Sequence, residues 1–327
     1  MVQNKLRIGL LFFFFGIIFP QVQFAQQVPS AQENIACLVT FGINGDHSWG
    51  DDDFSQTVFF SIPKSHTTPF YIRIFDPETI GELDEVREGW NTKTKFSIYG
   101  GKDSYNDKDA RGVNPIGNYK SGILMESRIF GSDAATDKKW ISMGPFNPQQ
   151  GEYVAEFDSY VFKLVIDGMS GDDGNGYKLF LSNANDDNVP LPGGNAFAYE
   201  YSVRLHSTAS SIAHVYPFAD NLISGFKIRT FDFDNDVDLK LYSSMKNGRP
   251  VSTSNNNEWS SNTQPIVEEE KNKCLDLQIV KKGDYMNDIV LYITNEYDVP
   301  VPFFATPLGG LPRYKYKVKV TKTAKDK

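Results

Sequence analysis

The sequence has little cysteine and little histidine, and past its first 25 residues it has no long apolar run. Its two cysteines, Cys37 and Cys274, allow at most one disulfide bond, which excludes a disulfide-stapled scaffold, and we expect both to be reduced core residues. The four histidines include no H-E-x-x-H pair, so a zinc hydrolase of that type is not expected. No later stretch approaches the roughly 18 apolar residues of a membrane helix, so no membrane span is expected.

The first 25 residues predict a cleaved export signal. Lys5 and Arg7 precede an apolar run over residues 8–19 that is too short to cross a bilayer, and we expect cleavage after Ala25. The expected location is secreted or periplasmic. Cleavage removes two positive charges from a chain whose formal net charge is already −8. An acidic protein binds phosphate backbones poorly, so nucleic acid is not an expected partner.

Helical patterns are nearly absent. Residues 77–90 (PETIGELDEVREGW) carry acidic residues as a helix start does, but Gly81 interrupts them, and a turn or a short helix is expected there. Most other runs alternate apolar with polar residues over a few positions and are separated by Gly, Asn, Asp, Ser and Pro. The Lys-rich residues 313–327 alternate in the same way and predict an edge strand that lysines protect from further pairing. This pattern favours antiparallel sandwiches over a barrel.

The chain also repeats itself in order, which indicates one structural unit used twice. We therefore predict an all-β fold of two tandem antiparallel β-sandwich, jelly-roll-like domains related by internal duplication. The expected domains are residues 26–207, with long loops, and residues 208–327, with the boundary in the polar segment 207–213. The first copy reads FYIRIFD, KFSIYGG, DKKW, YVFKLVIDG, GYKLFLSN and AYEYSVRLH, and the second reads GFKIRTFD, LKLYSS, NNEW, LDLQIVKKG, DIVLYITN and RYKYKVKV.

Carboxylates gather at the same place in both copies, directly after the strands FYIRIF and FKIRTF. Acidic side chains this dense repel one another unless a cation compensates them, and calcium takes six to eight oxygen ligands. A calcium site is one hypothesis for each copy, and a solvated acidic turn between two strands is the other. The candidate ligands are Asp232, Asp234, Asp236 and Asp238 in the second copy, and Asp76, Glu78 and Asp84 in the first.

One short run is similar to a known family. TFDFDNDVDLKLYSS resembles the Asp-x-Asp-Leu-x-Leu-Tyr strand entry of pre-peptidase C-terminal modules, which are calcium-associated β-sandwich appendages of secreted bacterial proteins. The resemblance implies a secreted sandwich with an accessory or adhesive role and calcium near the carboxylates. It covers about fifteen residues, and the first copy departs from it. The matching residues are Asp236, Asp238, Leu239, Leu241 and Tyr242.

Four tryptophans are candidate glycan-stacking residues. Trp140 and Trp259 occupy matching positions in the two copies, so a shared structural duty at the end of each sandwich is the alternative for them. Trp49 and Trp90 have no counterpart in the second copy, which makes their loops candidates for specific contacts.

No catalytic signature is present. The segment GDHSWG has Asp46 where a nucleophile elbow needs glycine, and adjacent strand residues face opposite ways, so His47 is poorly placed to activate Ser48. The leading hypothesis is a secreted, non-catalytic binding, adhesion or accessory protein that recognises a glycan or protein surface, with calcium as a candidate stabiliser. The alternatives are a polysaccharide hydrolase with an unrecognised carboxylate pair, and a structural envelope or matrix protein.

Overall fold

The computed structural model describes residues 26–113, 119–285 and 287–312. The expected signal peptide and the Lys-rich residues 313–327 lie outside the described residues. Within them the fold is all-β, as predicted: strands make up its regular structure together with a few short 3-10 turns, and no α-helix occurs there. The segment 77–90 forms bends and a single bridge from Glu85 to Gly174. The turns are η1 (His47–Trp49), η2 (Lys108–Arg111), η3 (Pro148–Gln150), η4 (Ala155–Phe157) and η5 (Glu268–Glu270).

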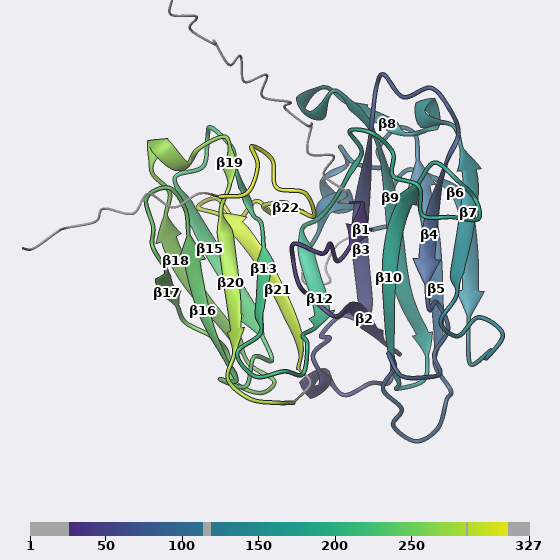
Figure 1. Cartoon of the computed structure of the whole chain (residues 1–327), viewed down its shortest axis with the longest axis horizontal. Helices are drawn as coiled ribbons and strands as arrows, with labels where there is room; N and C mark the ends of the chain where they lie inside the picture. Colours follow the sequence, from purple (N-terminus) through teal and green to yellow (C-terminus); the bar gives the residue numbers. More distant parts are fainter. Residues whose placement is uncertain (1–25, 114–118, 286, 313–327) are drawn as a thin grey trace, which may run out of the picture.

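The largest sheet runs through both halves of the molecule (Figure 1), and all of its strand pairs are antiparallel. Its order is β18 (Trp259–Pro265), β15 (Gly225–Phe231), β21 (Asp288–Asn295), β12 (Glu200–Arg204), β2 (Cys37–Phe41), β10 (Gly174–Ser182), β4 (Phe70–Phe75) and β7 (Trp140–Phe146), with β1 (Gln27–Val28) beside β10.

Smaller sheets complete the two sandwiches, and none closes into a barrel. The sheet of the first copy has the order β22 (Phe303–Phe304), β11 (Asn195–Ala198), β3 (Ser55–Pro63), β9 (Ser159–Ser170), β5 (Lys93–Gly100) and β6 (Ile123–Phe130), with β8 (Glu152–Val154) beside β9. The sheet of the second copy has the order β13 (Ile212–Val215), β20 (Asp276–Lys281), β16 (Val237–Tyr242) and β17 (Arg249–Val251). A two-stranded ribbon joins β14 (Phe218–Ala219) and β19 (Lys273–Cys274).

The sequence repeat corresponds to a repeated order of paired strands in the structure. The order β10-β4-β7 of the first copy recurs as β21-β15-β18 in the second, and β3-β9-β5-β6 recurs as β13-β20-β16-β17. The aligned sequence segments account for the matches of β4 with β15, β5 with β16, β7 with β18, β9 with β20 and β10 with β21, whereas β3 with β13 and β6 with β17 match by their place in the sheet order. The copies meet where β12 of the first pairs with β21 of the second, with Arg204 opposite Asp288 (Figure 1).

Apolar residues of the strands form a core that is continuous through both copies, and central strands such as β2, β10 and β21 are buried on both faces. Phe96, Phe162 and Tyr177 anchor it in the first copy, and Phe226 and Phe233 anchor it in the second. Each such side chain contributes about 1.5–3 kcal/mol on burial. The two cysteines, Cys37 and Cys274, are free and buried, as expected. None of the described residues forms a helix long and apolar enough to cross a membrane.

Candidate functional site

An aspartate in left-handed backbone conformation follows the same strand in both copies. Asp76 follows β4 and Asp232 follows β15, each with φ of 59°. The Asp76 carboxylate accepts a hydrogen bond from the backbone N–H of Lys138, and Asp232 Oδ1 accepts one from the N–H of Asn257 at 2.9 Å. The donor stands two residues before a tryptophan in each copy. The repeated aspartate therefore fixes the turn that leads into the next edge strand.

The two matching tryptophans pack on the residue that precedes this aspartate. Trp140 lies opposite Phe75 with ring centroids 5.3 Å apart, and Trp259 lies opposite Phe231 at 5.2 Å. Trp259 also contacts Tyr292 at 5.1 Å but stays exposed, whereas Trp140 is half-buried. Each ring covers the end of its sheet, which is the structural duty that the repeated position suggested.

In the first copy this turn belongs to a cluster of acidic groups. Oxygen atoms of Asp76, Glu78 and Asp137 all lie within 4.8 Å of one another. Asp76 and Glu78 are fully buried, and Asp137 is half-buried. Asp84 lies close enough for its pKa to respond to the charges of Asp76 and Glu78. The sequence singled out three of these four residues. Asp137 was missed because it belongs to the distant segment that ends at β7.

Many oxygen atoms of this cluster have no hydrogen-bond donor among the described residues. Leaving a buried polar atom unpaired costs about 1–3 kcal/mol, and more when it is charged. A bound cation removes that cost, because it supplies positive charge to several oxygens at once. The unpaired buried atoms are Asp76 Oδ2, Glu78 Oε1 and Oε2, Asp84 Oδ2, Asp137 Oδ1, Thr79 Oγ1 and Asn175 Oδ1.

The electrostatics of the cluster agree with its geometry. Burial, with a smaller contribution from the neighbouring Asp76 charge, raises the pKa of Glu78 to about 7. Burial likewise raises the pKa of Asp84 to about 8, with Asp76 and Glu78 adding to the effect. The carboxylates are therefore costly to ionise together unless a cation joins them.

The backbone of the loop holds these groups in place. Asn175 Nδ2 donates to the carbonyl of Pro77 at 2.9 Å, and the N–H of Thr79 donates to the carbonyl of Gly131 at 3.1 Å. Gly81 has φ of 124°, and a Cβ at that position would lie 2.7 Å from Asp137 Oδ1. The glycine that interrupts the helical pattern thus leaves room for the Asp137 carboxylate.

The acidic run of the second copy is dispersed over several partners. Asp236 Oδ2 accepts from Asn287 Nδ2 at 3.2 Å, and Asp238 Oδ1 lies 3.4 Å from Lys282 Nζ. Asp234 is exposed. Among the described residues, no group of three acidic, histidine or cysteine ligand atoms within 4.8 Å includes any member of this run.

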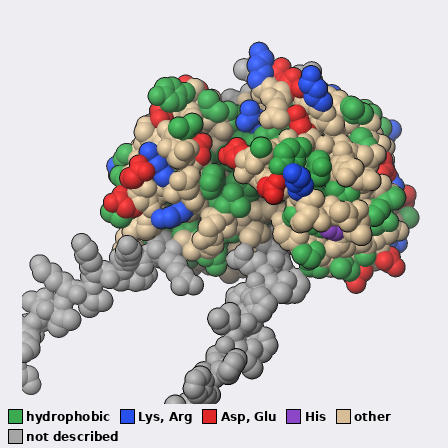
Figure 2. All heavy atoms as spheres, turned by 90° about the horizontal axis from the view of Figure 1, so that it is seen from above, with side chains coloured by type: hydrophobic (Ala, Val, Ile, Leu, Met, Phe, Trp, Pro, Cys, Tyr) green, Lys and Arg blue, Asp and Glu red, His purple; other side chains and the backbone are tan. Residues whose placement is uncertain are grey.

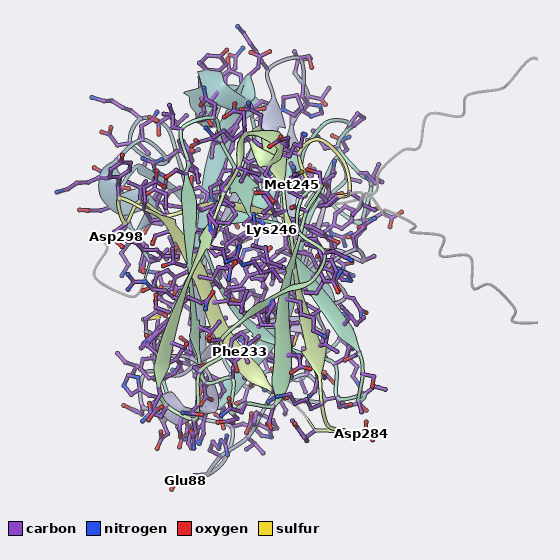
Figure 3. The ribbon with its side chains drawn as sticks, turned by 90° about the vertical axis from the view of Figure 1, so that its left-hand side faces the viewer. Glu88, Phe233, Met245, Lys246, Asp284 and Asp298 are labelled. Carbon is purple, nitrogen blue, oxygen red and sulfur yellow. The ribbon has the colours of Figure 1, made fainter. Side chains whose placement is uncertain are left out.

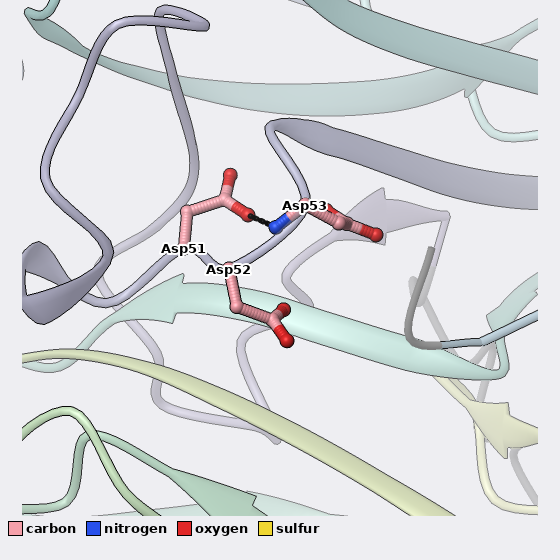
Figure 4. A group of neighbouring side chains, drawn as sticks. All are labelled: Asp51, Asp52 and Asp53. Atoms are coloured by element: carbon pink, nitrogen blue, oxygen red, sulfur yellow. Dashed lines mark hydrogen bonds between the residues drawn. The ribbon is translucent and has the colours of Figure 1, made fainter. Parts of the chain in front are cut away.

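A second acidic group, Asp51 to Asp53, forms part of the loop after η1 (Figure 4). Asp51 Oδ1 accepts from the N–H groups of Asp53 at 3.2 Å and Phe54 at 3.0 Å, and its Oδ2 accepts from the N–H of Phe41 at 3.3 Å. Burial raises the pKa of Asp51 to about 7. The run of three aspartates in the sequence was a visible signal for this group. Its most buried carboxylate holds the loop together by accepting backbone hydrogen bonds.

The two copies together line a cleft of about 330 Å³ at the lower end of the molecule in Figure 1; we call it the junction cleft. Figure 3 shows this end from the side, with Asp284 and Glu88 at its tip. The guanidinium of Arg87 lies 3.7 Å from the centre of the Trp49 ring and forms an ion pair with Glu85. The lining residues are Ser48, Trp49, Glu85, Arg87, Asp232, Asp234, Asn287 and Asp288.

The cleft unites residues that the sequence suggested for separate reasons, namely Trp49, Asp232 and Asp234. Burial raises the pKa of Asp232 to about 7, and the charges of Asp234 and Asp288 add to the shift. Asp288 is compensated by Arg204, whose Nε donates to its Oδ1 at 2.7 Å. Trp90, Trp140 and the remaining predicted ligands do not line this cleft.

The opposite end of the molecule, seen in Figure 2, has hydrophobic, acidic and basic side chains interspersed. A larger cavity, of about 820 Å³, lies in the second copy beside β19 and is lined in part by Glu270, Cys274 and Gly309. Its buried acid Glu270 is already compensated by Lys246 and Ser243. The junction cleft and the first-copy acidic cluster are therefore the better candidates.

The fold and these two sites define the chain as an all-β, two-sandwich protein with a candidate cation centre. No protein-family model matches it, and no curated protein matches it. A structure of the Macrobrachium rosenbergii nodavirus is similar at a TM-score of 0.17 and 8% identity, over 80% of this chain and 88% of that chain. A likeness this low carries no argument about function. The resemblance to pre-peptidase C-terminal modules stays a prediction.

Proposed function

We propose that this chain is an exported, non-catalytic binding protein that recognises an extracellular glycan at the junction cleft. The observation that supports the proposal is the composition of that cleft, which combines a tryptophan, an arginine and several carboxylates from both copies. Binding sites for small ligands are typically concave, with aromatic walls and a few polar groups that fix orientation. The stacked Arg87 guanidinium fixes the plane of the Trp49 ring, and the carboxylates of Asp232 and Asp234 are acceptors for sugar hydroxyl groups.

Calcium is the proposed cofactor, held by Asp76, Glu78 and Asp137, with Asp84 close by. Calcium prefers carboxylate and carbonyl oxygens, and these side chains offer several that no donor in the described part of the chain uses. The loop that carries Glu78 and Asp84 continues directly to Glu85 and Arg87, which line the junction cleft. A cation in the cluster would therefore order the loop that forms one wall of the glycan site.

The glycan site is tested by titrating the exported chain with glycans that it selects from an array. We expect Trp49→Ala to weaken binding at least tenfold because the cleft loses its aromatic wall and Arg87 loses the ring that positions it. Trp90→Ala is the matched control, since Trp90 is in a neighbouring loop but does not line the cleft. Equal affinities of the native chain and Trp49→Ala for the glycan would show that the junction cleft is not the glycan site. If the chain selected a protein instead of a glycan, the ligand of the cleft would be a protein surface.

The calcium site is tested by thermal unfolding with excess calcium and with a chelator. We expect calcium to raise Tm by several degrees, and Glu78→Gln to abolish the rise. Glu82→Gln is the matched control, because Glu82 belongs to the same loop but is exposed beside Lys138. If the native chain has the same Tm with calcium and with chelator, the proposed calcium site is wrong.

Hydrolysis of a polysaccharide is the second candidate, and the raised pKa of Asp232 favours it. A carboxyl group with a pKa of about 7 in a cleft can donate a proton near neutral pH, and Asp234 shares that cleft. If the chain released reducing ends from a bound glycan, and if Asp232→Asn abolished that release, the chain would be a hydrolase and the proposed non-catalytic role would be wrong. Binding without turnover supports the non-catalytic role.

A further inference from the structure

The first copy ends one of its sheets in a long, apolar edge strand. β6 has eight residues and, among the described residues, pairs only with β5. Its apolar side chains Ile123, Leu124 and Ile129 are 62%, 52% and 54% exposed. An edge strand presents unpaired backbone N–H and C=O groups that can pair with another strand.

The corresponding edge of the second copy is protected. Its edge strand β17 has three residues, Arg249, Pro250 and Val251, and proline provides no N–H for further pairing. Another edge strand of that copy, β18, has mostly polar residues. Since both copies have the same strand order, the difference between β6 and β17 is a difference in sequence at an equivalent place.

The sequence of β6 complements itself in antiparallel orientation. A twofold axis through Ser127 places Glu126 opposite Arg128 of the partner copy, and Arg128 opposite Glu126 of the partner copy. Within one copy, Arg128 Nε already lies 2.8 Å from Glu126 Oε1, so the four charges would alternate around the axis. Opposite charges directly across strands stabilise a sheet. Ile129, the exposed neighbour of Arg128, would be covered at the same seam. Met125, where the register of β6 against β5 shifts, packs partly against the core and takes no part in this pairing.

We propose that β6 is a dimerisation edge, at which two copies of this chain join their sheets antiparallel about Ser127. The dimer is closed, because a twofold axis makes each β6 use the same surface that it offers to its partner. It covers the exposed apolar side chains and pairs the free backbone groups.

Sedimentation velocity over a range of concentrations tests the association. We expect the exported chain to form a dimer, and Arg128→Glu to weaken it at least tenfold because like charges then face each other across the axis. Ile129→Lys should have the same effect. Leu222→Lys is the matched control, since Leu222 is 80% exposed and lies in the loop between β14 and β15 of the second copy. A native chain that stays monomeric throughout would overturn the proposal.

Crosslinking tests the register. Ser127 is exposed and would face its own counterpart, so Ser127→Cys should form a disulfide-linked dimer under mild oxidation. The native cysteines are buried and do not compete. Ser261→Cys on the polar edge β18 is the control and should form the dimer without a disulfide crosslink. A native dimer in which Ser127→Cys fails to crosslink, with its fold verified by circular dichroism, would show that another surface associates and would overturn the register.

Discussion

The two copies share a strand order but differ in what surrounds their common aspartate. Asp76 and Asp232 have the same left-handed conformation and each accepts a backbone hydrogen bond from the turn before a tryptophan. In the first copy Asp76 is joined by buried Glu78 and by Asp137, three residues before Trp140. In the second copy Asn256 stands three residues before its tryptophan and adds no charge. The repeated residues thus serve the fold, and the candidate cation centre depends on residues that are not repeated.

Cutting the contact between the copies should have the largest effect. Arg204 of β12 is buried and compensates Asp288 of β21, and it also reaches Glu85. Arg204→Met leaves a buried carboxylate uncompensated, which costs about 3–5 kcal/mol. We expect the free energy of unfolding from urea titration to fall by that amount in one transition, because the core is continuous. The exposed pair of Lys227 with Asp298 supplies the control, since Lys227→Met should leave the unfolding midpoint almost unchanged. Two separate transitions would contradict a common cooperative unit.

A buried glutamate at the same junction should make stability depend on pH. Burial raises the pKa of Glu33 to about 7, against hydrogen bonds from Ser30 and Tyr201, and the His214 charge opposes the shift weakly. The folded chain therefore retains a proton between about pH 4.5 and 7 that the unfolded chain releases. Stability should fall as pH rises through this window, by up to about 3 kcal/mol at about 1.4 kcal/mol per unit. Glu33→Gln should flatten that part of the profile measured by urea unfolding. An unchanged slope in the variant would assign the dependence to another group.

Much of this architecture was visible in the sequence, because alternation and turn residues are local signals. The all-β class, the duplication and the acidic residues Asp76, Glu78 and Asp84 were all predicted. Asp137 could not be added, since only the pairing of β4 with β7 brings it beside Asp76. The junction cleft could not be predicted from the sequence either. It depends on the pairing of β12 with β21 of the other copy, and an alignment of the two copies does not predict how they pack against each other.

Matched substitutions of the repeated aspartate separate its two roles. Asp76→Asn and Asp232→Asn each replace a carboxylate acceptor of a backbone N–H by a neutral amide oxygen, for which we expect a loss of about 1 kcal/mol in the presence of a chelator. Only Asp76→Asn should also reduce the stabilisation by calcium, because only Asp76 has neighbours that complete a ligand group. The measurement is the calcium-dependent change in Tm of both variants. An equal loss of the calcium effect in both would place a cation in each copy.

The smallest effect is expected in the acidic run of the second copy, where the resemblance to pre-peptidase C-terminal modules places calcium. Asp238 is exposed and faces Lys282 across 3.4 Å, an arrangement worth at most about 1 kcal/mol in water. Asp238→Asn should therefore change the unfolding free energy by less than that, and should leave the calcium-dependent rise in Tm intact. Lys282→Met probes the same pair from its basic side and should have an equally small effect. If Asp238→Asn instead halved the calcium-dependent rise in Tm, the dispersed carboxylates of the second copy would also bind a cation. The two copies would then differ in how their ligands are arranged, and not in whether they have ligands.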